Sequence, residues 1–481
     1  MDGEGAEPLV AMRATGCALH LLPVRTRLPL RFGHEVLHEV TCARVGLAVR
    51  DGEGRRACGW GETPLSAQWA WPGSLPLSER RDAMTDFCRR LVAVWAGFPE
   101  AGHPLVVGAR FLDEALPALL QGFNRERAPA EPMPHLAALI CCSAFDIALH
   151  DGYGALLRRP TYEAYGAADL GADDLGRFLK PASGGPATFT GLYPSDFLQA
   201  PLRRLPAWHL VGGADPLQPG DLDGSEPDDG HPVLLRDWIR RDGLRCLKVK
   251  LRGDDAAWDL ARLRTVGRIA AEEGCDWLSA DFNCTVEDPR YVSLALDQLR
   301  REDGETFRRL LYVEQPFAYD LEGSRLDVRG PAARRPLFMD ESASDWRLVR
   351  LGRDLGWSGV ALKTCKTQTG ALLSLAWARA HDMPLMVQDL TNPMLAQIPH
   401  VLLASRAGTI MGVETNAMQF YPDASRPEAE VHPGLYARRH GCVDLTTLGG
   451  PGFGYRLDRI RRELPPPDAV CGDIPEEGGG A

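Results

Sequence analysis

Seven short apolar runs in the second half of the chain each end in charged or polar residues. The strand-end positions lie about 23 to 33 residues apart, close to the roughly 30 residues of one β/α unit. They are, in order, Lys248 and Lys250, Asp281, Glu314, Asp340, Lys363, Asp389 and Glu414. With one more predicted strand at 188–192, the pattern indicates eight parallel strands in a (β/α)8 barrel. Active sites form at the carboxyl-terminal strand ends of such barrels.

The first third of the chain has a different pattern. Alternating residues at 41–50, followed by the turn 51–54, predict an antiparallel hairpin. Helical patterns follow at 77–95, 109–120 and 135–157. We therefore expect a tail at 1–10, an α+β domain at 11–155, a connection at 156–186, a barrel at 187–440 and a disordered tail at 466–481.

The segment 210–232 interrupts the barrel pattern with many Gly, Pro and Asp residues. A long loop of this kind is either a surface insertion or a functional element, such as a lid or an oligomer contact. The sequence leaves both interpretations open.

Composition narrows the class of protein. The 481 residues are 44% hydrophobic and 25% charged, with a formal net charge of −11. The basic residues are scattered, which argues against nucleic acid or a membrane surface as partner. No apolar stretch reaches the roughly 18 residues of a membrane span, and the acidic N-terminus does not resemble a signal peptide. The twelve cysteines suggest buried free thiols in the cytoplasm, with Cys365, between two lysines, standing apart.

Three successive strand-end carboxylates point to a metal site. Asp281, Glu314 and Asp340 should converge at one mouth of the barrel. A single strand-end carboxylate is more often a helix cap or an ion-pair partner, but three in succession between lysines favour a common role. Oxygen donors of this kind suit Mg2+.

The lysines fall on two sides of these carboxylates. Lys248 and Lys250 share one face of their strand, and Lys363 follows a strand beyond the carboxylates. Two bases across a metal-bound substrate could remove a proton from one face of a carbon and return it to the other. Crowding by a second ammonium group and a metal would lower a lysine pKa from about 10.4 towards about 7–8. Lys248 either supplies this field for Lys250 or is a solvated or phosphate-steering lysine.

Together these motifs resemble the enolase superfamily, and specifically its mandelate racemase/muconate lactonizing enzyme family, in the subgroup with a Lys-x-Lys motif. The matching segments are Lys248-Val249-Lys250, Asp281-Phe282-Asn283, Glu314-Gln315-Pro316, Asp340-Glu341-Ser342 and Leu362-Lys363. Residues 60–64 and 144–151 resemble the family's capping domain, and 451–454 its C-terminal return onto the cap, expected at 441–465.

The resemblance implies a modified TIM barrel with an N-terminal α+β capping domain. It implies Mg2+ on Asp281, Glu314 and Asp340, with Lys250 and Lys363 as opposed acid/base catalysts. In this superfamily a Lys or His base acts with Mg2+, which stabilises an enediolate. Glu341 is an alternative third ligand.

The resemblance also suggests substrate-binding residues. Loops 31–35 and 66–71 of the cap would close over the mouth and bring His34, Trp69 and Trp71 to the substrate, although packing between cap and barrel explains them equally well. Glu414 could contact the substrate or Lys363. Asp389, Glu341 and Asn283 complete the candidate set.

The expected activity is Mg2+-dependent racemisation or epimerisation of a dipeptide-like or N-acyl-amino-acid-like carboxylate. The alternative is a lyase or cycloisomerase, such as a muconate lactonizing, o-succinylbenzoate synthase or sugar-acid dehydratase type. A metal-dependent hydrolase is disfavoured, because no histidine ends the assigned strands. A non-catalytic metal-binding barrel is a remote alternative. The expected partner is a small carboxylate, and the resemblance implies a homo-oligomer.

Overall fold

The computed structural model describes residues 9–474. Its N-terminal domain is built on an antiparallel sheet with the strand order β13-β1-β2-β3. The strands are β1 (Met12–Phe32), β2 (Glu35–Asp51), β3 (Arg56–Pro64) and β13 (Ala469–Gly472). β1 and β2 form a long hairpin that pairs from Met12 with Asp51 to Phe32 with Glu35. Its tip turns at Gly33, whose φ of +49° suits glycine.

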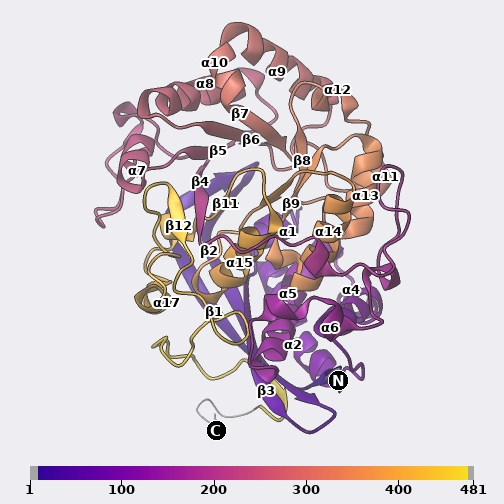
Figure 1. The fold of residues 1–481 in the computed structure, drawn as a ribbon. Coiled ribbons are helices and arrows are strands. Elements are labelled where there is room, and N and C mark those ends of the chain that lie inside the picture. Colours follow the sequence, from indigo (N-terminus) through magenta and orange to yellow (C-terminus); the bar gives the residue numbers. More distant parts are fainter. Residues whose placement is uncertain (1–8, 475–481) are drawn as a thin grey trace, which may run out of the picture.

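Helices cover one face of this sheet (Figure 1). They are α1 (Ala67–Ala70), α2 (Leu77–Ala96), α3 (Pro104–Arg110), α4 (Leu116–Arg127) and α5 (His135–Leu156). In the described part of the chain, α5 alone is long and apolar enough to cross a membrane, but its apolar window is completely buried inside the protein. We therefore interpret α5 as the core helix of this domain.

The second domain is a nearly closed barrel of eight parallel strands in the order β10-β9-β8-β7-β6-β5-β4-β11. The strands are β4 (Arg204–Val211), β5 (Cys246–Lys250), β6 (Trp277–Asp281), β7 (Leu310–Glu314), β8 (Leu337–Met339), β9 (Gly359–Leu362), β10 (Leu385–Val387) and β11 (Val413–Glu414). A short antiparallel strand, β12 (Cys442–Asp444), pairs with β4.

Helices connect successive barrel strands, and local signals fix their ends. The main ones are α7 (Leu235–Asp242), α8 (Ala256–Glu273), α9 (Pro289–Glu302), α10 (Gly304–Arg309), α13 (Trp346–Leu355), α14 (Gln368–Ala380) and α15 (Gln397–Ala407). Asp255, Asp288 and Asp345 cap the starts of α8, α9 and α13 by accepting bonds from first-turn N–H groups. Gly274 and Gly356 end α8 and α13 in the left-handed region.

Shorter helices complete the architecture. They are α6 (Ala167–Leu170), α11 (Leu321–Ser324), α12 (Arg329–Ala332), α16 (Ala417–Phe420) and α17 (Arg426–Val431).

Two predicted elements are wrong. Residues 188–192 form turns, and the first barrel strand is β4, further along the chain. Residues 469–472, expected in a disordered tail, form β13 and pair with β1 at Gly16–Leu19. Of the two predicted tails, residues 1–8 and 475–481 lie outside the described residues.

Helix α5 attaches the cap to the barrel next to the strand ends. The Asp146 carboxylate accepts bonds from the Thr369 N–H at 2.8 Å and the Thr369 hydroxyl at 2.7 Å. Ser143 Oγ donates to the Thr364 carbonyl at 2.7 Å. Asp151 accepts from the Phe453 N–H at 2.7 Å, which ties the chain after the barrel to the same helix. These contacts hold the cap over the carboxyl-terminal end of the barrel.

Candidate active site

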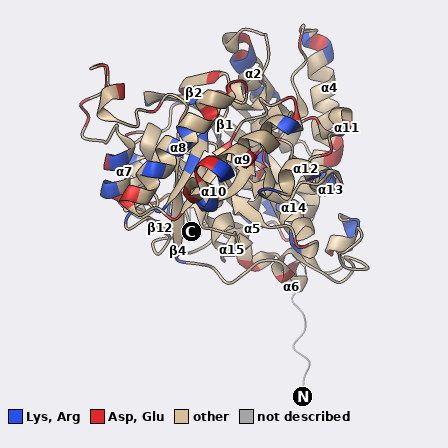
Figure 2. Ribbon diagram, turned by 90° about the horizontal axis from the view of Figure 1, so that it is seen from above, with Lys and Arg blue, Asp and Glu red and all other residues tan. Residues whose placement is uncertain are grey.

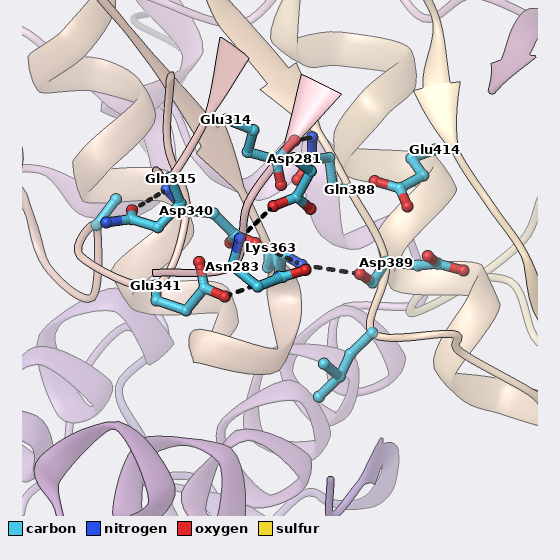
Figure 3. Close-up of polar contacts among 12 residues, drawn as sticks. Asp281, Asn283, Glu314, Gln315, Asp340, Glu341, Lys363, Gln388, Asp389 and Glu414 are labelled. Carbon is cyan, nitrogen blue, oxygen red and sulfur yellow. Dashed lines mark hydrogen bonds and ion pairs between the residues drawn. The ribbon is translucent and has the colours of Figure 1, made fainter. Parts of the chain in front are cut away.

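The strand ends bring lysines and carboxylates into one buried cluster (Figure 3). Lys248 lies among three carboxylates. Its Nζ is 2.6 Å from Glu314 Oε1, 2.9 Å from Glu414 Oε2 and 3.0 Å from Asp281 Oδ2. Gln388 Nε2 donates to the other Glu314 oxygen at 2.5 Å. Lys248 therefore holds three strand ends together and is not a solvated steering lysine.

Lys250 and Lys363 lie on either side of the carboxylate strands. Lys250 Nζ is 2.5 Å from Asp281 Oδ2 and 2.9 Å from Asn283 Oδ1. Lys363 Nζ is 3.0 Å from Asp340 Oδ2 and donates to the Asp389 carbonyl at 3.0 Å. In the sheet order, β6, β7 and β8 separate the two lysines.

The charges in the cluster shift one another's pKa values. Burial opposes ionisation of Asp281, but Lys250 and Lys248 outweigh it and lower the pKa of Asp281. Burial also opposes ionisation of Asp340, and Lys363 and Lys366 likewise lower its pKa. Burial and the charge of Asp281 raise the pKa of Glu314. Two strand-end carboxylates are thus held ionised, while the third carries an electrostatic penalty.

Carboxylates raise the pKa values of two of the lysines. Burial lowers the pKa of Lys363, but Asp340 outweighs burial, and the pKa is raised. The pKa of Lys248 is also raised, because Glu314 and Glu414 outweigh its burial. The neighbouring carboxylates thus outweigh the neighbouring ammonium groups at both lysines.

The cluster carries an excess of negative charge. Six buried carboxylates face four buried ammonium groups, so the fully ionised cluster has two uncompensated negative charges. The carboxylates belong to Asp281, Glu314, Asp340, Glu341, Asp389 and Glu414, and the ammonium groups to Lys248, Lys250, Lys363 and Lys366. The donor set and its charge fit a divalent cation. Within residues 9–474, however, no three His, Cys, Asp or Glu side chains are already placed to hold a metal together.

The remaining polar candidates occupy distinct places. Glu414 contacts Lys248 and Asn416, and within residues 9–474 it forms no hydrogen bond or ion pair with Lys363. The Asp389 carboxylate accepts the Asn416 N–H at 2.8 Å, so its carbonyl is the group that binds Lys363. Glu341 Oε1 accepts from Asn283 Nδ2 at 3.1 Å. Burial and Asp340 raise the pKa of Glu341 to about 7.

Two cavities adjoin the cluster. A small chamber of about 40 Å³ is lined by Lys248, Lys250 and Lys363 together with Glu414 and Asp389. A larger cavity of about 730 Å³ lies between the cap and the loops after β6 and β7, with Asn283 and Glu341 in its wall. Phe32 and Trp69 line both cavities.

The cap residues divide into two groups. Trp69 lies under Lys363, with Nζ 4.7 Å from its ring centre. His34 lines the larger cavity. Trp71 is buried against α2, where its carbonyl accepts a bond from Arg80 at 2.6 Å, and it lines neither cavity. Packing within the cap accounts for the position of Trp71.

Sequence reasoning missed Lys366, which contacts the Asp340 carbonyl and Asp340 Oδ1, the latter at 3.3 Å. A usable signal was available. The chain has five lysines among 54 basic residues, and four of the five are in this cluster. The basic residues on the outer helices in Figure 2 are accordingly almost all arginines. Cys365, which the sequence singled out, is buried, and burial raises its pKa to about 12, so its thiol is not activated.

Backbone strain marks the same region. Asn283, Cys284, Gln315, Thr367 and Thr391 all have positive φ, between +30° and +77°. Each follows a barrel strand. Left-handed non-glycine residues are costly and cluster at functional sites. Gln315 illustrates what the strain achieves, because its side-chain oxygen accepts the N–H groups of Asp340 at 2.8 Å and Ser342 at 3.2 Å and orients the third carboxylate.

Comparisons with known proteins show a family match and similar folds. Residues 233–461 match the model of the family described as Enolase C-terminal domain-like. An aromatic dipeptide epimerase from Herpetosiphon aurantiacus is 24% identical over 251 residues, which are 52% of this chain and 66% of that relative. The match thus spans slightly less than two thirds of the relative's length.

Solved structures share the fold across both domains. A dipeptide epimerase from Enterococcus faecalis, in complex with Mg and the dipeptide L-Leu-L-Tyr, has a TM-score of 0.58 at 14% identity, covering 92% of this chain and 99% of that one. A muconate lactonizing enzyme from Klebsiella pneumoniae has a TM-score of 0.55 at 16% identity, covering 94% of this chain and 100% of that one.

Proposed function

Since this chain belongs to the enolase superfamily, we propose that it is an enzyme that removes the α-proton of a carboxylate substrate and returns a proton to the same carbon. The reaction is racemisation or epimerisation of a dipeptide-like or N-acyl-amino-acid-like acid. The observation that carries the proposal is the position of Lys250 and Lys363 on opposite sides of three strand-end carboxylates. Cytoplasmic location and homo-oligomeric assembly belong to the same proposal.

Asp281, Glu314 and Asp340 would hold Mg2+. When bound, the ion would offset the negative charge that develops on the substrate carboxylate as the α-proton leaves. The excess of two negative charges in the cluster supports this assignment. Lys248 keeps Asp281 and Glu314 in position, and Gln315 does the same for Asp340.

Lys250 and Lys363 would exchange roles with the direction of reaction. For one epimer Lys250 accepts the α-proton at Nζ and Lys363 donates to the opposite face, and for the other epimer the reverse holds. Both Nζ atoms line one small chamber with Phe32 and Trp69 in its wall, and these buried surroundings would limit the access of bulk water to the carbanion.

The test is α-deuterium incorporation in deuterated water across pooled dipeptides, N-acyl amino acids, sugar acids and lactone precursors, with Mg2+ and again with a chelator. We expect Mg2+-dependent exchange and formation of the second epimer for at least one member. Absence of exchange from every member, with metal binding confirmed, would contradict the proposal.

A cycloisomerase or lyase is the second candidate. The two lysines have unlike partners, since Lys250 contacts two side chains while Lys363 contacts a carboxylate and a backbone carbonyl. Such asymmetry suits a reaction in which one lysine is the base and the other stays a cation. In that case the same assay would show a dehydrated or cyclised product without the second epimer.

A further inference from the structure

The larger cavity beside the lysine chamber has acidic residues but no Lys or Arg of the described chain in its wall. The acids are Glu35, Glu287 and Glu341. The chamber next to it is lined by three lysines together with Asp389 and Glu414. A ligand that extends from the chamber into the cavity therefore leaves the ammonium groups behind and enters a space whose described wall has carboxylates but no lysine or arginine.

Glu341 is the most buried of these acids, with 4% of its surface exposed. Its Oε1 atom accepts a bond from Asn283, but Oε2 has no hydrogen-bond partner in the described structure. A buried carboxylate oxygen without a donor is energetically unfavourable. A ligand in the cavity can supply the hydrogen-bond donor that this carboxylate oxygen lacks.

The other two acids differ in how far they are already neutralised. Glu35 is 3.4 Å from Arg80, a buried arginine, and part of its charge is balanced. Glu287 is exposed, and the described structure gives it no ion pair. Glu287 is therefore the least compensated acid of the wall, and Glu341 supplies the buried acceptor without a donor.

Aromatic rings complete the wall. Phe32, Trp69, Phe317 and Tyr319 line the cavity. Organic cations bind favourably over aromatic faces and beside carboxylates. Its volume of about 730 Å³ also lies in the range of about 300–1,000 Å³ that small-molecule sites occupy.

We propose that this cavity binds the positively charged distal end of the substrate, so that the substrate is a carboxylic acid that carries an amine or guanidinium group away from the reacting carbon. This inference rests on the proposed function, which places the substrate carboxylate in the lysine chamber. It narrows the substrate class to molecules with a negative and a positive end.

Binding affinity tests the inference separately from turnover. Calorimetry with Mg2+ would compare Ala-Lys and Lys-Ala dipeptides with the same peptides in which norleucine or glutamate replaces lysine. We expect one lysine peptide to bind at least about tenfold more tightly than its norleucine counterpart, as one charge-assisted hydrogen bond allows. The glutamate peptide should bind most weakly.

Variants assign the effect to the cavity. Glu341→Gln and Glu287→Gln should each reduce the lysine-to-norleucine affinity ratio, and Glu287→Lys should favour the glutamate peptide. Glu163→Gln, an exposed acid outside the cavity, should leave the ratio unchanged. Glu341 is next to Asp340, so Glu341→Gln could also weaken binding of every peptide. The variant supports charge selectivity if the affinity for the lysine peptide falls more than the affinity for the norleucine peptide, and contradicts it if both fall equally.

The two proposals fail in different ways. Equal or tighter binding of norleucine or glutamate peptides, or no binding of either lysine peptide, would overturn the charge selectivity. Tight binding of a lysine peptide without α-deuterium exchange would leave the charge selectivity standing and contradict the proposed reaction.

Discussion

Arginine and lysine occupy different places in this protein. Arginine supplies nearly all of the positive charge of the chain, while four of the five lysines lie in one buried cluster. Arginine forms stronger bidentate ion pairs but does not lose its proton in proteins, whereas buried lysine can act as a base. A purely structural ion-pair cluster gives no reason for this bias, but proton transfer does.

One buried histidine makes stability depend on pH. His103 caps α3, because its Nδ1 accepts the Leu105 N–H at 3.1 Å while Nε2 contacts the Ala164 carbonyl at 2.8 Å. Burial lowers its pKa to about 3. The folded state therefore binds its proton less readily than the unfolded state, and stability falls as the pH drops from about 6.5 towards 3.

We predict that His103→Asn reduces this loss. Asparagine keeps a capping acceptor but has no proton to gain. Between pH 6.5 and 4.5 the unfolding free energy of the variant should fall by about 2–3 kcal/mol less than that of the wild type. Chemical denaturation at both pH values measures it, with the exposed His38→Asn as control. The same pH slope in wild type and His103→Asn would contradict the prediction.

At the scale of elements, the sequence predicted the site better than the connections around it. Strands β5 to β11 are buried apolar runs with polar ends, so both their existence and the side chains at their ends were readable. Strand β4 was missed because Arg204 and Pro206 interrupt its apolar pattern. Strand β13 was missed because its pairing with β1 joins positions 450 or more residues apart. The pairing of each lysine with its carboxylate depends on tertiary packing and could not be predicted from the sequence.

The insertion after β4 also acquires a role at this scale. The Arg27 guanidinium binds Asp229 with bonds of 2.7 and 2.8 Å and donates to the Pro232 carbonyl at 3.1 Å. The Gly213 N–H donates to the Arg31 carbonyl at 2.8 Å. The segment 212–232 is therefore bonded to the β1–β2 hairpin near Phe32, and Phe32 lines both cavities.

Loss of the bonds between the segment 212–232 and the hairpin should weaken substrate binding. The lysine chamber of about 40 Å³ has room for only a few water molecules, so we infer that the hairpin tip moves to admit a substrate. We predict that Asp229→Asn raises KM about threefold to tenfold, with kcat changed less than twofold, as expected for loss of uniform binding.

Hydrogen exchange of residues 30–37 should accelerate in Asp229→Asn at the same time. Arg25→Ala is the matched control, because Arg25 lies on the same hairpin but is largely exposed and has only a 3.6 Å ion pair. If Asp229→Asn left both KM and exchange at the wild-type level, the insertion would be a passive surface loop.

The whole molecule places a charged cluster between two folded domains. The cap contributes Phe32 and Trp69 to its wall, and α5 connects to the barrel through Ser143 and Asp146. Because the cluster carries excess negative charge, a bound divalent cation should stabilise the folded protein.

We predict that Mg2+ at 100 times its dissociation constant raises the unfolding free energy by about 2.7 kcal/mol. Asp281→Asn and Asp340→Asn should lose most of this gain, whereas Asp327→Asn, on the outer surface, should keep it. Denaturation with and without Mg2+ measures the effect. An equal gain in all three variants would locate the cation outside the strand-end cluster.

The most direct test of the account follows exchange from each face of the α-carbon. Lys250→Ala and Lys363→Ala are incubated separately with each pure epimer of a substrate in deuterated water with Mg2+. We expect both variants to lose epimerisation. Each variant should still exchange the α-proton of one epimer, and the epimer that Lys250→Ala exchanges should differ from the one that Lys363→Ala exchanges. Retained epimerisation in either variant, or loss of exchange for the same epimer in both, would contradict two-base catalysis.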